Sequence, residues 1–365
     1  MTNVRTEGVG SQLRTTELLE ARARHEAGEL DAAAFKRIED HAVDEAVAVQ
    51  EAVGLDVVSD GELRRRGWMT HFYEAVDGLE AGGGPGLPWR DVDPDNAGEV
   101  ELSRRPVVVD KLRWKRSACA EEWVYLRGRA TGPAKMTLPS AEMAAALYSE
   151  EKSSAAYPTR EEYFADVVDI LRRELTELVR LGGTYIQLDA PQYGALLDPT
   201  TREVFRQQGS DPDQMIDAGI EMDNAIIADF PGITFGLHIC RGNNQSKFYA
   251  EGDYSPISRL FKRANFDRYL LEYDDERSGG FQPLRDVRED AVVVLGLITT
   301  KRSAMESAEE IRARIEEASA YVPLERLALS PQCGFASMME GNAIDEDAQR
   351  RKLELVIEVA RSVWG

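Results

Sequence analysis

Hydrophobic residues follow two patterns along this chain. Short runs rich in Val, Ile, Leu and Tyr alternate with longer stretches in which apolar positions repeat every three or four residues. The short runs predict strands and the longer stretches predict amphipathic helices. The predicted strands cover residues 4–11, 54–62, 130–137, 184–191, 234–240, 269–274, 292–298 and 327–330. The predicted helices cover residues 16–28, 32–53, 141–148, 160–181, 213–229, 255–264, 307–320 and 346–363.

Eight strand segments, most of them followed by a helix, predict an α/β fold. We expect a single (β/α)8 TIM barrel that forms one catalytic domain over residues 1–365, with a doubly wound open sheet as the alternative. Residues 78–128 break the alternation, because a Gly-rich and Pro-rich stretch is followed there by alternating β-branched and charged residues. They predict a hairpin-like excursion between the second and third strands, inserted within the barrel and lying over its site.

The composition excludes several classes of partner. The chain has 65 acidic and 44 basic side chains, a formal net charge of -21, which repels phosphate backbones and anionic membranes. We therefore expect no nucleic acid and no membrane partner. The first seven residues lack the apolar core of a signal peptide, and the longest apolar run, near residues 291–298, is too short to cross a bilayer, so we expect a cytoplasmic protein. Three cysteines suit a reducing compartment in which thiols serve chemistry.

A histidine and two cysteines stand at the ends of predicted strands. His238 and Cys240 are two residues apart, so their side chains point to the same side of the strand that ends there. Cys333 follows the last predicted strand, and the carboxyl ends of barrel strands meet at one face. Imidazole and thiolate ligands suit Zn²⁺. An isolated His-x-Cys is often a pair of half-buried residues, but the second cysteine at a strand end favours a metal site.

Other polar residues occupy the same topological level. Ser11, Glu62, Asp189 and Glu272 each end a predicted strand, so a barrel would place them around one mouth. Each acid also has an ordinary explanation, because Glu62 could cap a helix and Glu272 could belong to a solvated acidic loop. Their recurrence at one level favours a shared site.

These residues resemble the cobalamin-independent methionine synthase family, namely its C-terminal catalytic barrel and the shorter single-barrel relatives. The resemblance rests on six motifs in the family's order: V-G-S at 9–11, D-G-E at 60–62, Q-L-D-A-P at 187–191, H-I-C at 238–240, L-E-Y at 271–273 and P-Q-C-G-F at 331–335. It implies that the zinc ligands are His238, Cys240, Glu272 and Cys333. It also implies that Ser11, Glu62 and Asp189 hold the amino acid part of homocysteine.

The resemblance implies an enzyme that uses Zn²⁺ as its cofactor and transfers a methyl group to a thiol activated as a zinc thiolate. A thiol is mostly protonated at neutral pH, and coordination to Zn²⁺ deprotonates it. The implied partners are a small-molecule thiol, such as the homocysteine that becomes methionine, and a methyl donor, either methyltetrahydrofolate or another compound. Self-association into a homo-oligomer stays open.

Two departures from the large methionine synthases leave the donor open. The chain has length for one barrel where they have two, and it lacks both their folate-stacking tryptophan after the third strand's Gly-Pro and their proton-donating D-x-H-S segment after the seventh strand. Lys301 and His71 are alternative proton sources, although Lys301 could be a surface cation and His71 a packed residue. Trp68 could replace the aromatic platform, although the sequence favours burial in the core.

Two other functions are compatible with these residues. A zinc-dependent epoxyalkane:coenzyme M transferase is similar in its single-barrel layout, and it would transfer an alkyl group from an epoxide or other electrophile to a thiol such as coenzyme M. A non-catalytic zinc-binding barrel would need a closed site with four protein ligands. Cys119 has no strand-end context and we assign it no role.

Overall fold

A six-stranded parallel sheet forms most of the barrel wall. The computed structural model describes residues 4–84, 86–92 and 100–365. Neighbouring strands of the sheet follow the order β10-β9-β8-β7-β6-β5. Their bounds are β5 (Met136–Pro139), β6 (Tyr185–Asp189), β7 (Thr234–Ile239), β8 (Arg268–Glu272), β9 (Val292–Ile298) and β10 (Leu327–Pro331). All six strands are buried on both faces, as in a parallel sheet that helices cover.

Two irregular segments near the N-terminus close the sheet into a ring. Parallel bridges join Thr6 to Leu329 of β10, Glu7 to Val57, and Val58 to Ala134, just before β5. The backbone of Val58 bonds on both sides of Ala134, donating to Pro133 at 3.0 Å and accepting from Lys135 at 2.9 Å. Eight parallel segments therefore surround one axis, and the prediction of a (β/α)8 barrel is confirmed.

The first two segments were expected as strands over residues 4–11 and 54–62, but only single bridges form there. A side chain takes the place of part of the ladder, because the Asp56 carboxylate accepts hydrogen bonds from the backbone N–H of Arg5 (2.7 Å) and Thr6 (2.9 Å). The second segment ends at Glu62, whose φ of 55° lies in the left-handed region and is incompatible with an extended strand. The sequence pattern predicted the positions of these two segments in the barrel correctly. It did not predict that a side chain would bond the backbone N–H groups of the first segment.

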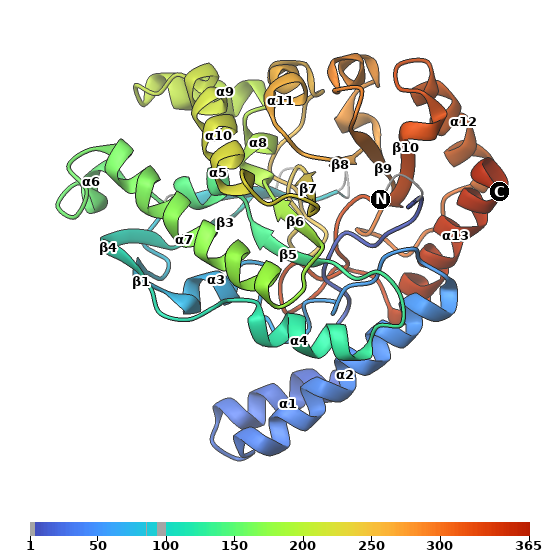
Figure 1. Ribbon diagram of the computed structural model, residues 1–365, viewed down its shortest axis with the longest axis horizontal. Helices are drawn as coiled ribbons and strands as arrows, with labels where there is room; N and C mark the ends of the chain where they lie inside the picture. Colours follow the sequence, from blue (N-terminus) through green and yellow to red (C-terminus); the bar gives the residue numbers. More distant parts are fainter. Residues whose placement is uncertain (1–3, 85, 93–99) are drawn as a thin grey trace.

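Helices cover the outside of the ring, as Figure 1 shows for α2, α7, α10, α11, α12 and α13. The helices are α1 (Thr16–Glu26), α2 (Ala32–Val53), α3 (Thr70–Ala75), α4 (Ala120–Arg129), α5 (Ala141–Ala145), α6 (Glu150–Ser153), α7 (Arg160–Arg180), α8 (Pro191–Ala195), α9 (Pro199–Gln207), α10 (Pro212–Ile227), α11 (Ser258–Arg263), α12 (Ala308–Ser319) and α13 (Glu346–Trp364). Several begin at side-chain caps, for example Asp31, Thr159, Ser307 and Asp345, which accept from backbone N–H groups of the first turn. Within the described ranges, none of these helices combines the length and the apolar character needed to cross a bilayer.

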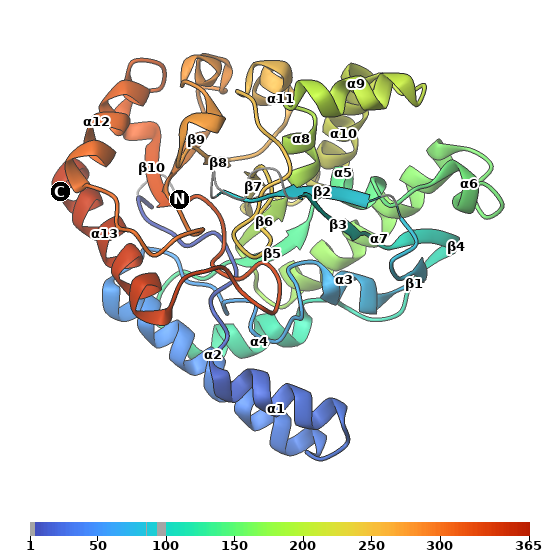
Figure 2. The same cartoon turned by 180° about the vertical axis from the view of Figure 1, so that it is seen from behind.

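An insertion between the second and third barrel segments forms two antiparallel pairs. They are β1 (Val76–Glu80) with β4 (Val107–Trp114), and β2 (Gly86–Arg90) with β3 (Val100–Arg104). Residues 78–128 were expected as one hairpin-like excursion, whereas β1 begins at Val76 and the range also contains most of α4. The backbones of Arg90 and Phe248 exchange two hydrogen bonds, of 2.7 and 2.9 Å, so β2 is attached to the loop that follows β7. Figure 2 shows β2 and β3 on the side of the barrel strands nearer the viewer.

A buried ionic cluster lies inside the barrel near the amino ends of the strands. The Glu7 carboxylate accepts from Lys135 at 2.6 Å and from Tyr185 at 2.7 Å, and it pairs with Arg268 at 2.8 Å. Lys135 also donates to Gln187 at 2.6 Å. Burial alone would raise the pKa of Glu7, but the charges of Lys135 and Arg268 hold it at about 2. One carboxylate thus connects four barrel segments.

Replacing Glu7 with Gln should destabilise the protein strongly. The substitution leaves two buried cations without their shared counter-ion, a change that typically costs about 3–5 kcal/mol. Chemical and thermal unfolding measure the loss, and Asp110→Asn, which breaks an exposed pair with Arg113, is the control. Because the pKa of Glu7 is about 2 and its ordinary value is 4.5, this stabilisation is complete above pH 4.5 and falls as the pH drops from 4.5 toward 2. Equal melting temperatures for the two variants would contradict the role of the cluster.

Candidate metal centre

A cavity of about 240 Å³ opens at the carboxyl ends of the barrel strands. Ligands of barrel proteins bind at this end, where the loops after each strand meet. The cavity brings together residues that the sequence analysis selected from five different segments. These residues are Ser11, Glu62, Trp68, Asp189, His238, Cys240 and Cys333.

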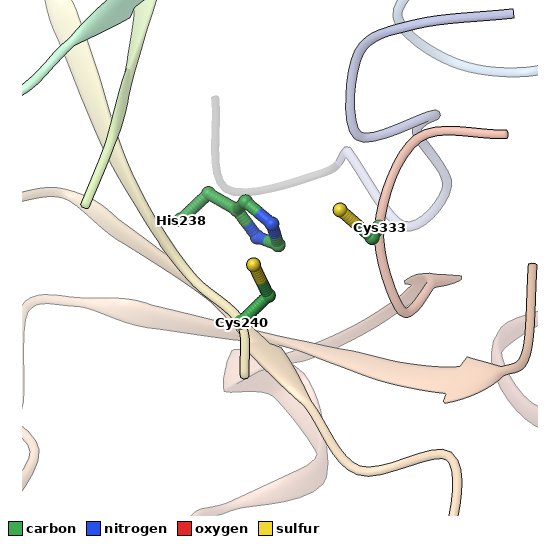
Figure 3. A group of neighbouring side chains, drawn as sticks. All are labelled: His238, Cys240 and Cys333. Carbon is green, nitrogen blue, oxygen red and sulfur yellow. The ribbon is translucent and has the colours of Figure 1, made fainter. Parts of the chain in front are cut away.

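Three of these side chains form a compact group of metal-ligating atoms. One ligand atom from each of His238, Cys240 and Cys333 lies within 4.8 Å of the other two. Figure 3 shows that their side chains point toward one another, two from the end of β7 and one from the loop after β10. All three are buried, yet all three line the cavity. The group is therefore shielded by the protein and open to a small ligand.

The orientation of His238 suits a metal ligand. Its Nδ1 lies 3.1 Å from the carbonyl oxygen of Leu270, which assigns the proton to Nδ1 and leaves Nε2 with its lone pair. Nε2 is buried and has no hydrogen-bond partner among the residues that the structure describes. A buried acceptor without a partner costs free energy, and a cation would satisfy it. One imidazole and two sulfurs are the ligand types that Zn²⁺ prefers, so the residues fit this ion.

The two thiols are unequal. The hydrogen bond between their sulfurs holds the pKa of Cys333 well below its usual range and raises the pKa of Cys240 well above it. Their environment thus favours the thiolate form of Cys333, which accepts a hydrogen bond from the thiol of Cys240. Thiolates are the form in which cysteine binds metals.

Glu272 and Lys301 lie behind this group as an ion pair. The Glu272 carboxylate accepts from the backbone N–H of Arg241 at 2.6 Å, and its other oxygen lies 3.6 Å from Lys301 Nζ. Burial alone would raise the pKa of Glu272, but Lys301, Arg241 and Arg277 lower it below its ordinary value. Glu272 is not a member of the three-residue group, so its role as a fourth ligand stays a prediction. Lys301 is buried, contrary to the surface alternative, and it does not line the cavity.

Two carboxylic acids, Glu62 and Asp189, also line the cavity. Glu62 accepts from Thr137 Oγ1 at 2.6 Å and lies 3.5 Å from Arg65, and its second oxygen has no partner in the described part of the chain. Burial raises the pKa of Glu62 above its ordinary value despite these contacts. Burial also raises the pKa of Asp189, to about 7, although His238 acts in the opposite direction. Both acids would gain from a cationic group of a ligand, because it would compensate their desolvation.

The structure separates the two residues predicted near position 70. Trp68 is half-buried and lines the cavity, where its indole can contact a ligand. His71 is buried beside the cavity wall without lining it, and burial together with Arg65 lowers its pKa well below the ordinary value. A neutral imidazole cannot donate the proton of an imidazolium, so the structure gives no support to His71 as a proton source.

Several lining residues were missed by the sequence analysis. The insertion contributes Trp89, Ser103 and Arg105, and the loops after β7 and β10 contribute Asn243 and Ser337. The sequence analysis placed this insertion over the site but singled out none of its residues. The asparagine and serine carry no chemical signature in a sequence, because their role depends on which loop they face.

Comparison with known proteins decides the family. The sequence model described as "Cobalamin-independent synthase, Catalytic domain" matches residues 4–361. The Bacillus subtilis protein YxjH is 37% identical over 366 residues, which cover 99% of this chain and 94% of that protein. The chain belongs to the cobalamin-independent methionine synthase family.

More distant relatives of the family agree with this assignment. The methionine synthase of Pyrococcus abyssi is 25% identical over 358 residues, 98% of this chain and 92% of that protein. A solved structure from Listeria monocytogenes, described as a candidate vitamin-B12 independent methionine synthase, has a TM-score of 0.76 and 28% identity and covers 99% of this chain and 98% of its own. The fold is shared by a B12-independent methionine synthase from Shewanella sp. W3-18-1. Its TM-score is 0.76 at 22% identity, and the match covers 99% of this chain and 97% of that one. Family membership makes this chain a methyltransferase of the methionine synthase kind that acts on small molecules.

The site of this family member depends on a close approach between two backbones. A Cβ atom at Gly194 of α8 would lie 1.9 Å from the carbonyl oxygen of Cys240, so only glycine fits there. Gly194→Ala should displace Cys240 and lower the melting temperature, since overpacking against backbone typically costs about 1–3 kcal/mol. Gly128→Ala in α4 is the control, because nothing lies within 4 Å of its Cβ position and alanine favours a helix. Thermal unfolding of both variants, with labelling of Cys240, measures the difference; wild-type behaviour of Gly194→Ala would contradict this packing.

Proposed function

We propose that this protein is a zinc-dependent methyltransferase that methylates a thiol amino acid, with homocysteine as the substrate that its residues suit best. The observation that supports this is the grouping of His238, Cys240 and Cys333 in a cavity that is also lined by two carboxylic acids, Glu62 and Asp189. The open cavity beside the sulfurs argues against a closed structural site with four protein ligands.

The residues that line the cavity would have two roles, metal binding and substrate binding. His238, Cys240 and Cys333 would hold Zn²⁺, and the bound ion would lower the pKa of a thiol that reaches it. Glu62 and Asp189 would pair with the substrate ammonium, and Ser11 would hydrogen-bond its carboxylate. Binding of both the ammonium and the carboxylate would orient the substrate with its sulfur near the metal group. Such orientation contributes a large part of the rate enhancement in group transfers.

The transfer itself forms one bond and breaks another. The substrate sulfur bonds to the methyl carbon while the bond between that carbon and the donor breaks, and its electron pair stays on the donor. The thiol releases one proton and the departing donor takes up one, so charge and atoms balance. Trp68 on the cavity wall would contact the donor; methyltetrahydrofolate or another methyl compound could occupy that space.

Removal of the proposed ligands should remove the metal. His238→Ala and Cys333→Ser should each weaken zinc binding by more than about 100-fold, beyond the 10–100-fold typical of losing a hydrogen-bond partner of a ligand. Zinc content by elemental analysis and methyl transfer from a panel of donors measure the effect, and a chelator should abolish turnover by the wild-type protein. Cys119→Ala is the matched control, because this buried cysteine lies outside the metal group. Full zinc content and turnover in both ligand variants would exclude the proposal.

Substrate selectivity tests the role of the acids. Glu62→Gln should weaken homocysteine binding about 10–100-fold, because a charge-assisted hydrogen bond contributes roughly 1.5–3 kcal/mol. Binding of 4-mercaptobutyrate, which has the same thiol and carboxylate but no ammonium, should not change. Isothermal titration of the zinc-loaded protein measures both. Tighter binding of coenzyme M than of homocysteine by the wild-type protein would instead support the alternative, alkyl transfer to a thiol sulfonate.

A further inference from the structure

The two cysteines of the metal group stand on strands that do not touch. Cys240 follows β7 and Cys333 follows β10, and β8 and β9 lie between these strands in the sheet. Pairing between neighbouring strands therefore does not set the distance between the two sulfurs. That distance depends on the conformations of the loops that carry the cysteines. The ligand atoms of these cysteines lie within 4.8 Å of each other, and a direct connection between the loop after β7 and the loop after β10 would hold them at this distance.

Asn243 makes this connection. It lies three residues after Cys240, and its side-chain Nδ2 donates to the backbone carbonyl of Gly334 at 2.7 Å and to Ser337 Oγ at 3.2 Å. Gly334 directly follows Cys333. The side chain of Asn243 is buried, with an exposed fraction of 5% for the residue, so water competes little for these hydrogen bonds.

A second asparagine fixes the orientation of the first. Asn342 Nδ2 donates to Asn243 Oδ1 at 2.9 Å and to the carbonyl of Thr300 at 2.8 Å, while its Oδ1 accepts from the backbone N–H of Ser246 at 2.8 Å. The carbonyl oxygen of Asn243 thus has a donor, which leaves its NH₂ group to face Gly334 and Ser337.

The bond from Asn243 also directs the hydroxyl of Ser337. Because Ser337 Oγ accepts from Asn243, its own hydrogen is available for another acceptor, and Cys333 Sγ lies 3.8 Å away. This distance is within the range of a hydrogen bond to sulfur. A hydroxyl that donates to a ligand sulfur restricts the direction in which the sulfur can bind a metal.

We infer that Asn243 is a positioning residue, which sets the separation of Cys240 and Cys333 by holding their two loops together and which orients Cys333 through Ser337. The inference deepens the proposed function and rests on it for the metal readout only. Asn243 acts through the cysteines and is assigned no step in the transfer.

Metal binding by the full-length Asn243→Ala protein tests the inference. The affinity for Co²⁺ and Zn²⁺, measured by competition with a chromophoric chelator, should fall about 10–100-fold, the range typical for partners of metal ligands. The sulfur-to-cobalt charge-transfer band should shift or weaken, because one thiolate no longer meets the ion in the same direction. Ser337→Ala should give a smaller loss, since the bond from Asn243 to Gly334 remains.

A metal-free measurement separates this inference from the proposed function. Dibromobimane becomes fluorescent when it bridges two neighbouring thiols, and it should bridge Cys240 and Cys333 more slowly in Asn243→Ala than in the wild-type protein. Slower bridging in a protein that binds neither metal would support the positioning role and reject the zinc-dependent function.

Asn224→Ala is the matched control. Asn224 in α10 also joins two elements through its side chain, donating to the carbonyl of Arg263 at 2.9 Å and accepting from the N–H of Asn265 at 2.8 Å, but it is remote from the metal group. Its removal should leave metal affinity and bridging rate unchanged. If Asn243→Ala does not fold, Asn243→Asp keeps the size and the acceptor for Asn342, loses the two donated bonds and adds a buried carboxyl group facing the carbonyl of Gly334. Unchanged affinity, cobalt spectrum and bridging rate in a folded Asn243 variant, or a lowered melting temperature alone, would overturn the inference.

Discussion

The distance between two sulfurs from strands that are not neighbours is the constraint on which the site depends. A parallel barrel brings the carboxyl ends of its strands to one face, but it fixes distances only between adjacent strands. His238 lies in β7 and Cys240 directly follows the strand, so their relation follows from the alternation of side chains along it. Cys333 reaches them across two intervening strands, so buried asparagine and serine side chains must add what the sheet does not provide.

The sequence predicted the regular part of the fold well, because each element there has a complete local signal. The predicted strand at 292–298 has the bounds of β9, and the predicted helix at 32–53 has those of α2. Prediction was poorer where side chains replace backbone pairing. Asp56 occupies the N–H groups that would have continued the first strand, and a pattern of apolar residues contains no information about that bond.

In the candidate site, too, some residues could be predicted from the sequence and others could not. Residues with distinctive chemistry, such as His238, Cys333 and Asp189, could be found because thiols, imidazoles and acids are ligand groups and their places at strand ends predict a shared face. Asn243 and Trp89 could not, because their position in the cavity depends on the path of a loop and of an insertion. The strands of the insertion form two small sheets outside the barrel wall, yet residues of the insertion line part of the cavity. A segment that adds nothing to the barrel sheet can therefore still contribute to the site.

The contact between Ser11 and Gly334 has a consequence for biosynthesis. A Cβ atom at Gly334 would lie 2.1 Å from Ser11 Oγ, and the backbone N–H of Phe335 donates to the carbonyl of Ser11 at 2.8 Å, so the beginning and the end of the chain meet beside the third metal ligand. Cys333 lies 93 positions after Cys240, so a ribosome must synthesise all of the intervening chain before the centre can assemble. During translation, the imidazole and first thiol at positions 238 and 240 emerge without their partner, and the three-residue group can form only after position 333 has left the ribosome.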